Sequence, residues 1–227
     1  MNLEDRLAEV RSEYRRRLSA SGGLLHEVEV HLGRTVGKML RPRLTLLAAD
    51  TLGHAGTRRT LLAATCVEML HNASLLHDDI IDHADQRRGQ SSVNARWGNG
   101  VAVLVGDYHL AQIMTLLDEM DDREATRMVN QTVIDMVQSE LLQKEVGLGM
   151  QELTPDTYLR IIDGKTASLF ATACALGNPT LGDFGLHYGR LFQLRDDMAD
   201  GEAPDFAKQF IDSEMQEIEN LEYKLSI

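Results

Sequence analysis

Two acidic motifs in this chain share one spacing, Asp-Asp-x-x-Asp. Their members are Asp78, Asp79, Asp82, Asp196, Asp197 and Asp200. On a helix, the first and last aspartates of each motif would project from the same face, because residues four apart lie one above the other. Two carboxylates about 4 Å apart repel by about 4 kcal/mol at an effective dielectric of 20, so a partly buried cluster needs cations or raised pKa values.

Magnesium is the cation that this chemistry favours. Mg2+ prefers oxygen ligands, keeps several of its waters, and usually completes its shell with substrate phosphates rather than with a cage made only of protein. Neither motif has a cysteine beside it. The motifs therefore predict a Mg2+ site and a substrate that carries a polyphosphate.

The alternative is that each motif is a solvated helix face, which is common in an acidic chain. The flanking sequences favour the metal-site hypothesis. Residues 68–77 and 191–195 are apolar at helical spacing, which predicts that each motif ends an amphipathic helix that faces the core. Gln193 lies three residues before Asp196 and extends the polar stripe of the second motif.

Positively charged side chains that could meet phosphate occur in three segments. They are Lys38, Arg41, Arg87, Arg88 and Lys165. The first two lie at a predicted loop-to-helix junction, where free backbone N–H groups and the helix dipole also favour an anion. The arginine pair comes after the first motif, although paired arginines often only decorate a surface. The last lysine interrupts an apolar helix, where a charge needs a partner.

Taken together, these segments resemble the trans-isoprenyl diphosphate synthases, the all-helical family that elongates allylic diphosphates with isopentenyl diphosphate. Residues 37–42 are similar to the family's GKxxRP element, residues 75–82 to its first aspartate-rich motif, and residues 87–89 to the RRG element after it. Further matches occur in the family's order at residues 106–108, Glu140 with Gln143, residues 165–167 and residues 192–200. The resemblance covers about residues 30–201.

The resemblance implies a fold and an activity. The fold would be an all-α, isoprenoid synthase-type helical bundle around a central cavity, with residues 1–227 as a single polyprenyl synthetase-like domain. The activity would be a Mg2+-dependent condensation of an allylic diphosphate with isopentenyl diphosphate, which gives a longer trans-polyprenyl diphosphate and pyrophosphate. Departure of pyrophosphate leaves a carbocation, so catalysis is mainly charge stabilisation.

Carried over by position, the resemblance also implies residue roles. The catalytic set would be Asp78, Asp79, Asp82, Lys165, Asp196 and Asp197. The metal ligands would be Asp78, Asp82, Asp196, Asp197 and Asp200. The substrate-binding set would be Lys38, Arg41, His71, Arg87, Arg88, Lys165, Thr166 and Gln193. Without the resemblance, His71 on its apolar face would be interpreted as a core histidine.

Product length in this family depends on the bulk beneath the first aspartate motif. Ala73 and Ser74 are small, which suggests a product longer than a short farnesyl chain. Met69 and Cys66, about one and two turns deeper on the helix, could still set a limit. The number of isoprene units is therefore left open.

The C-terminal segment departs from the family pattern. Family members usually continue well past the second aspartate motif, whereas this sequence ends at residue 227, which predicts a member shortened after that motif. Residues 201–204 should break the helix, and Asp205 can cap a last amphipathic one.

Composition constrains the partners and the location. The net charge of −12 argues against nucleic acid. We find no run of 18 apolar residues that would predict a membrane span, and the charged N-terminus is unlike a secretory signal, so we expect a cytoplasmic location. Cys66 and Cys174 are predicted core residues in a reducing compartment. Residues 101–105 could form a strand by propensity, but they lie in a longer helix-like segment.

The family resemblance adds a dimer, either a homodimer or a heterodimer. Three functions from different classes remain open: an active prenyltransferase, a non-catalytic or regulatory subunit of a heteromeric prenyl diphosphate synthase, and a helical binding module. The complete motifs favour the enzyme, whereas the short C-terminal segment favours the subunit. A terpene cyclase would leave Lys38, Arg41 and Arg88 without a clear role.

Overall fold

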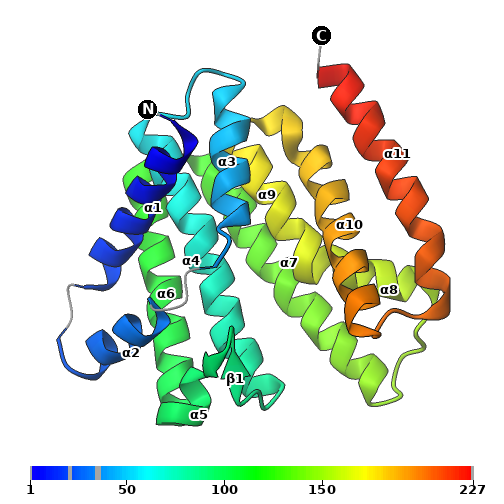
Figure 1. Ribbon diagram of the computed structural model, residues 1–227, viewed down its shortest axis with the longest axis horizontal. Coiled ribbons are helices and arrows are strands. Elements are labelled where there is room, and N and C mark those ends of the chain that lie inside the picture. The colour runs from blue at the N-terminus through cyan, green and yellow to red at the C-terminus, as the bar shows by residue number, and fades with distance from the viewer. Residues whose placement is uncertain (1, 20–21, 34–36, 226–227) are drawn as a thin grey trace. The chain divides into compact units, whose positions relative to one another are not determined.

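The computed structural model describes residues 2–19, 22–33 and 37–225, and these fold almost entirely as helices (Figure 1). The all-α prediction is therefore confirmed. The chain divides into two compact units, residues 1–122 and residues 123–227. The expectation of a single domain stays a prediction.

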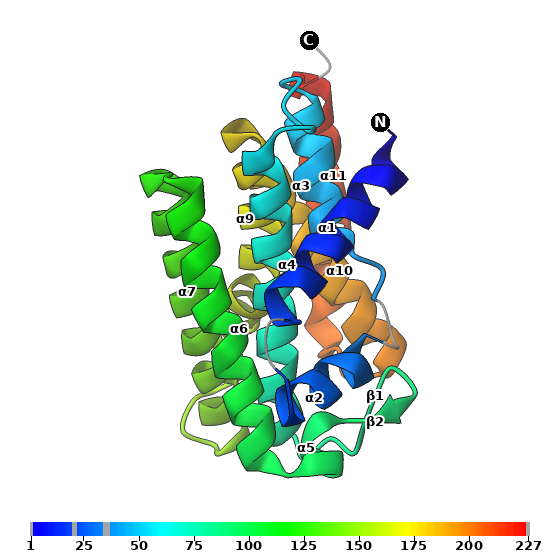
Figure 2. The same ribbon diagram turned by 90° about the vertical axis from the view of Figure 1, so that its left-hand side faces the viewer.

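The first unit is built on two long helices. Its elements are α1 (Leu3–Leu18), α2 (Leu24–Leu32), α3 (Leu40–Asp50), α4 (Arg58–Ile81), β1 (Gln86–Arg87), β2 (Gln90–Ser91), α5 (Val93–Trp97) and α6 (Asn99–Met120). Helices α4 and α6 pack along each other, and α1 lies across α4 (Figure 2). The Thr57 hydroxyl caps α4 by accepting a hydrogen bond from the Thr60 N–H. The predicted core position of Cys66 is confirmed, because this thiol is fully buried.

Helix α6 includes residues 101–105, which form helix and not strand. The local β-propensity of this segment is outweighed by packing, because the helix buries Ala102 and Val105 in the core of this unit. By length and composition α6 could cross a membrane, with a mean hydropathy of 1.4 over an 18-residue window. A single helix of this kind is weak support for a span, because a buried core helix has the same composition.

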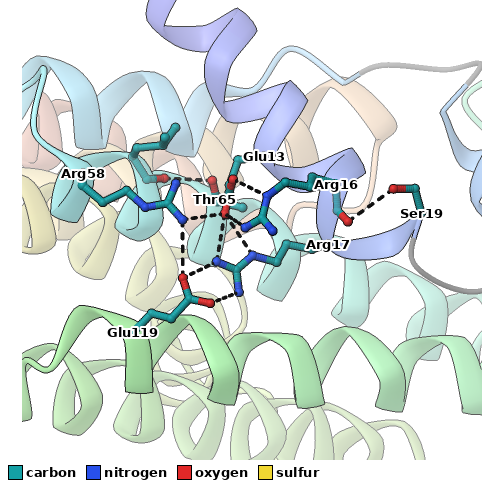
Figure 3. A network of polar contacts seen from close by, with 8 residues as sticks. Glu13, Arg16, Arg17, Ser19, Arg58, Thr65 and Glu119 are labelled. Carbon is teal, nitrogen blue, oxygen red and sulfur yellow. Dashed lines mark hydrogen bonds and ion pairs between the residues drawn. The ribbon is translucent and has the colours of Figure 1, made fainter.

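Buried charges fasten α1 to the rest of this unit (Figure 3). The Arg17 guanidinium donates to both Glu119 oxygens on α6, at 2.7 and 2.6 Å. It also donates to Glu13 Oε1 at 3.0 and 2.8 Å. Arg16 and Arg58 contact the same Glu13 carboxylate, and the hydrogen bond from Arg16 is the largest cause that lowers the Glu13 pKa to about 2.

The second unit is a set of packed helices. Its elements are α7 (Arg123–Gly147), α8 (Pro155–Ile162), the π-helical turn η1 (Asp163–Ala167), α9 (Ser168–Gly177), η2 (Pro179–Leu181), α10 (Gly182–Asp200), η3 (Asp205–Ala207) and α11 (Lys208–Leu225). Helix α9 lies beside α10 (Figure 1), at very short range. A Cβ at Gly185 would lie 2.5 Å from the Phe170 carbonyl oxygen, and one at Gly189 would lie 2.6 Å from the Ala167 Cα. Cys174 is buried in α9, as predicted.

The segment after the second aspartate motif differs in detail from the prediction. Residues 201–204 break the helix as expected. Asp205 does not cap α11, however, because it lies within the 3-10 turn η3, and α11 begins at Lys208. This turn packs Phe206 and Ala207 against Tyr158, Ile162 and Leu194.

Candidate active site

The first aspartate motif ends α4, as predicted. Helix α4 runs to Ile81, and Asp82 occupies its C-cap position, with the Asp82 N–H donating to the Asp78 carbonyl at 2.8 Å. Asp79 is the buried member of the motif. Its Oδ1 accepts two hydrogen bonds from Arg87, from Nε at 2.8 Å and from Nη2 at 2.5 Å. This charge-assisted pair fixes Asp79, while Asp82 is exposed.

The Arg-Arg-Gly segment forms a tight hairpin between β1 and β2. Gln86 pairs with Ser91, and Arg87 pairs with Gln90, so Arg88 and Gly89 are the two turn residues. Both have positive φ angles, 52° and 78°, as a two-residue hairpin of this hand requires. Such a φ is uncommon for arginine, and strained residues of this kind cluster at functional sites. The hairpin directs Arg87 back onto α4.

A cationic cluster forms where this hairpin meets the start of α3. The Arg88 guanidinium lies so close to Gly37 that a Cβ there would be 2.7 Å from Nη2. The Arg41 pKa is lowered to about 10, with burial as the largest cause; Arg88 acts in the same direction and Glu68 opposes it. The His71 pKa lies well below its ordinary value. Burial is the largest cause, and the positive charges of Arg41, Arg88 and Arg87 act in the same direction. Arg41, His71 and Arg88, three members of the predicted substrate-binding set, thus lie near one another, and the two arginine charges favour binding of an anion.

One residue of the predicted substrate-binding set, Lys38, lies differently. Lys38 is exposed beside residues 34–36, which fall outside the described part of the chain. Met39 occupies the N-cap position of α3 with a φ of 51°, and its Sδ accepts a hydrogen bond from Arg11 at 3.0 Å. The amides of the first turn of α3 are therefore not capped by the Met39 side chain, in keeping with an anion site at this helix start.

A pocket of about 400 Å3 opens beside this cluster within the first unit. Its walls include Gly37, Glu68, Asn72, Asp79 and Arg88, together with residues of α1 and α2. Asp78 and Asp82 are not among its lining residues. The pocket is therefore bordered by Arg88 of the cationic cluster and by Asp79, the buried aspartate of the first motif.

The second aspartate motif ends α10, also as predicted. Gly201 closes the helix in the left-handed conformation. Asp196 and Asp200 are exposed, whereas Asp197 is half-buried. Asp197 Oδ1 accepts a hydrogen bond from Gln193 Nε2 at 2.6 Å, and its Oδ2 accepts one from the Tyr158 hydroxyl at 2.5 Å.

The Lys-Thr segment forms the π-helical turn between α8 and α9. π-Helical turns are frequent at functional sites. Lys165 Nζ donates to Gln143 Oε1 at 2.8 Å and lies 3.0 Å from Glu140 Oε2 on α7. The Thr166 hydroxyl donates to Gln193 Oε1 on α10 at 2.6 Å. The partner that a charge in this apolar helix requires is therefore Glu140.

The carboxylates of the two motifs suit a hard cation whose coordination shell is completed by substrate. Within the described ranges, no three His, Cys, Asp or Glu side chains converge on a point that could hold a metal ion. Asp79 and Asp197 are each engaged by donors from their own unit. Asp78, Asp82, Asp196 and Asp200 offer carboxylates at the last turns of α4 and α10, which is the chemistry Mg2+ accepts when phosphates and waters supply its other ligands.

Two buried polar residues of these sites are absent from the sequence prediction. Tyr158 lies on α8, and its hydrogen bond to Asp197 joins it to α10, so no local spacing marks it. Glu68 lies close enough to Arg41 and Arg88 for each to lower its pKa, although burial is the largest cause and the net shift is upward. Its place three residues before His71 is the local signal that could have identified it.

Comparison with known proteins agrees with these motifs. A family profile described as "Polyprenyl synthetase" matches residues 23–212. The chain is 35% identical over 192 residues to an all-trans-nonaprenyl-diphosphate synthase (geranyl-diphosphate specific) of Rhodobacter capsulatus, covering 81% of this chain and 59% of that protein. It is 36% identical over 209 residues to heptaprenyl diphosphate synthase component 2 of Geobacillus stearothermophilus, covering 87% of this chain and 64% of that protein.

A solved structure shows the same fold. The polyprenyl synthase of Caulobacter crescentus CB15, complexed with calcium and isoprenyl diphosphate, superposes with a TM-score of 0.80 at 33% identity, covering 86% of this chain and 62% of that one. The chain spans 59% and 64% of the two curated relatives. The expected resemblance is confirmed: this chain belongs to the polyprenyl synthetase family.

Proposed function

We propose that this protein is a Mg2+-dependent trans-prenyltransferase that condenses an allylic diphosphate with isopentenyl diphosphate. One observation carries the proposal. The chain combines two helix-ending aspartate motifs with a separate cationic cluster of Arg41, His71 and Arg88. An elongating enzyme needs two diphosphate sites, one that ionises its substrate and one that only holds it.

The first substrate site in this proposal is for the allylic diphosphate. Asp78, Asp82, Asp196 and Asp200 would hold Mg2+, which would supply positive charge to stabilise the departing pyrophosphate. In this proposal both motifs are required for Mg2+-dependent binding of the diphosphate. Its other contacts are with Arg87, Lys165, Thr166 and Gln193. Glu140 and Gln143 keep the Lys165 ammonium in place, at 3.0 and 2.8 Å.

The second site is for isopentenyl diphosphate. Its diphosphate binds at the cationic cluster, with Lys38 added from the start of α3. The low pKa of His71 keeps its imidazole neutral when no ligand is bound, so His71 acts there as a hydrogen-bond partner. The bound double bond is held in attack geometry, and buried apolar helices keep water from the carbocation.

We also propose that the protein is a dimer. Helix α7 exposes Ile134, Val137 and Leu141 by 47%, 55% and 59%, at spacings of three and four residues. Such a stripe on one helix face is typical of a surface that is buried by a partner. A homodimer is the simplest assembly, and a heterodimer is the alternative. The cytoplasmic location stays a prediction.

The test is elongation with radiolabelled isopentenyl diphosphate, Mg2+ and a series of allylic diphosphate primers. We expect a longer, acid-labile product from the wild-type protein and none from Asp78→Ala, because the diphosphate loses a metal site. Asp183→Ala, at the other end of α10 from the second motif, is the control and should keep activity. The product also shows the chain length, for which Ala73 and Ser74 predict more units than farnesyl.

One relative favours the alternative of a subunit in a heteromeric synthase. The Geobacillus stearothermophilus protein is called component 2 of heptaprenyl diphosphate synthase. If the wild-type protein forms no product with any primer, and Mg2+ with pyrophosphate does not raise its melting temperature, the subunit function replaces the enzyme function.

A further inference from the structure

The Asp197 carboxylate is held from both sides. Its Oδ2 accepts a hydrogen bond from the Tyr158 hydroxyl at 2.5 Å, and its Oδ1 accepts one from Gln193 Nε2 at 2.6 Å. The two donors come from different elements, α8 and α10. The carboxylate orientation is therefore set by the packing of two helices and not by its own rotamer preference.

The chain of hydrogen bonds continues to the π-helical turn. Because Gln193 donates through Nε2 to Asp197, its Oε1 is left to accept, and the Thr166 hydroxyl donates to it at 2.6 Å. The order of donors and acceptors is thus fixed from Thr166 to Asp197. Two residues proposed to contact the allylic diphosphate, Thr166 and Gln193, are oriented by this one carboxylate.

Tyr158 is itself held in place by the segment after the motif. Its side chain is 6% exposed and packs against Ile162, Leu194 and Ala207. The Phe206 ring of η3 lies edge-on to its ring, with centroids 5.9 Å apart. Burial, and next the hydrogen bond to Asp197, raise the Tyr158 pKa above its ordinary value, so the phenol stays a donor at all ordinary pH values.

The middle aspartate of the first motif is also held by hydrogen bonds within its own unit. This aspartate, Asp79, accepts two hydrogen bonds from Arg87, and its backbone carbonyl accepts from the Ala84 N–H at 2.9 Å. The Asp197 carbonyl accepts likewise from the Glu202 N–H at 2.8 Å. The middle aspartate of each motif is therefore held within its own unit. Asp79 is held by the Arg87 cation, and Asp197 by the neutral Tyr158 phenol.

We propose that Tyr158 is a positioning residue that commits Asp197 to orienting Gln193 and Thr166, so that Asp196 and Asp200 are the metal-binding members of the second motif. Without the phenol, Asp197 Oδ2 loses its donor, and the carboxylate can turn toward the metal and release Gln193. This inference rests on the proposed function. Loss of the hydroxyl thus frees two residues proposed to contact the diphosphate, and removal of such hydrogen-bonded groups behind a metal site typically changes metal affinity or activity by about 10- to 100-fold.

The test compares Tyr158→Phe with the wild-type protein. This substitution keeps the ring against Phe206 and removes only the hydroxyl. The matched control is Tyr188→Phe, a tyrosine of α10 whose ring packs on Phe170 and Phe184. Binding of Mg2+ with inorganic pyrophosphate is measured by titration calorimetry, which needs no turnover.

We expect about 10-fold weaker binding of Mg2+ with pyrophosphate by Tyr158→Phe, and wild-type binding by Tyr188→Phe. In the elongation assay, the Mg2+ concentration for half-maximal rate should rise, while the KM for isopentenyl diphosphate stays unchanged. In an Asp197→Asn background, Tyr158→Phe should add little, because the two residues act as one unit.

The results that would overturn the inference are distinct from those that would overturn the function. If the wild-type protein elongates substrate and Tyr158→Phe binds Mg2+ with pyrophosphate within twofold of it, the positioning role is wrong and the function stands. Equal losses in Tyr158→Phe and Tyr188→Phe would also reject the role. If the wild-type protein neither elongates nor binds Mg2+ with pyrophosphate, both proposals fail.

Discussion

At the scale of single residues, buried titratable groups behave differently from the exposed aspartates. Glu29 of α2 is such a group, because burial raises the pKa of its carboxyl to about 8. Burial also lowers the pKa of the neighbouring His109 to about 4, so that imidazole is neutral. His109 Nδ1 donates to the Val105 carbonyl at 2.8 Å, and the Tyr14 hydroxyl donates to Nε2. The 3.8 Å separation between His109 and Glu29 is therefore not an ion pair at neutral pH.

This arrangement predicts how stability depends on pH. The folded protein retains the Glu29 proton up to a pKa of about 8, while the ordinary value is 4.5, so its contribution to stability is full below pH 4.5 and is lost as pH rises through 8. Glu29→Gln should therefore raise the free energy of unfolding above pH 8 by a few kcal/mol. Urea denaturation at pH 6 and pH 9 measures this difference. Equal stabilities of the two proteins at both pH values would contradict it.

Residue spacing in the sequence was a good guide to some of these groups and a poor guide to others. The apolar periodicity of residues 68–77 and 191–195 predicted that the motifs end α4 and α10, because helix periodicity is local. The substrate-binding role of Arg41, His71 and Arg88 was predicted from the family resemblance, since spacing does not connect residues so distant in sequence. Tyr158 was missed because its role depends on the contact between α8 and α10, which no local pattern contains.

At the scale of elements, the π-helical turn η1 orients three side chains toward neighbouring helices. Lys165 reaches α7, Thr166 reaches Gln193 on α10, and Asp163 pairs with Arg190 of α10 at 2.5 Å. A regular α-helix would not present all three in this way, because the extra residue in the turn shifts the register of the next helix, α9. The sequence predicted one apolar helix through this segment, since nothing in local propensity marks a π turn.

The charge network on α1 gives a prediction at the same scale. Arg17 is 4% exposed and joins Glu13 to Glu119. Arg17→Met should lower the free energy of unfolding by about 2 kcal/mol, because it removes charge-assisted hydrogen bonds to the buried Glu13 carboxylate and the link to Glu119. Urea denaturation at pH 7 measures this effect. Arg127→Met, which breaks an exposed pair with Glu124, is the control and should change stability by less than about 0.5 kcal/mol.

Acid denaturation offers a second measure of the same network. The Glu13 pKa lies at about 2, below the ordinary value of 4.5. Its contribution is therefore present above pH 4.5 and lost as pH falls toward 2. The loss of stability over this range should be smaller in Arg17→Met than in the wild-type protein. An unchanged or steeper acid dependence would mean that the network does not hold α1.

At the scale of the whole molecule, the all-α fold and the family could be predicted from the sequence, and the profile match over residues 23–212 confirms the family. The motifs identify the family well because their chemistry fixes residue type and spacing together. Details that depend on packing could not be predicted in the same way. The start of α11 at Lys208 instead of after Asp205 is one such detail, because it results from burying Phe206 against Tyr158.

The central claim is that both aspartate motifs are required for Mg2+-dependent binding of pyrophosphate. Titration calorimetry of the wild-type protein, Asp78→Asn, Asp196→Asn and the double variant with Mg2+ and inorganic pyrophosphate tests it most directly. We predict a large loss of the Mg2+-dependent affinity for pyrophosphate in each single variant, and little further loss in the double variant. Wild-type Mg2+-dependent affinity in either single variant would contradict the claim.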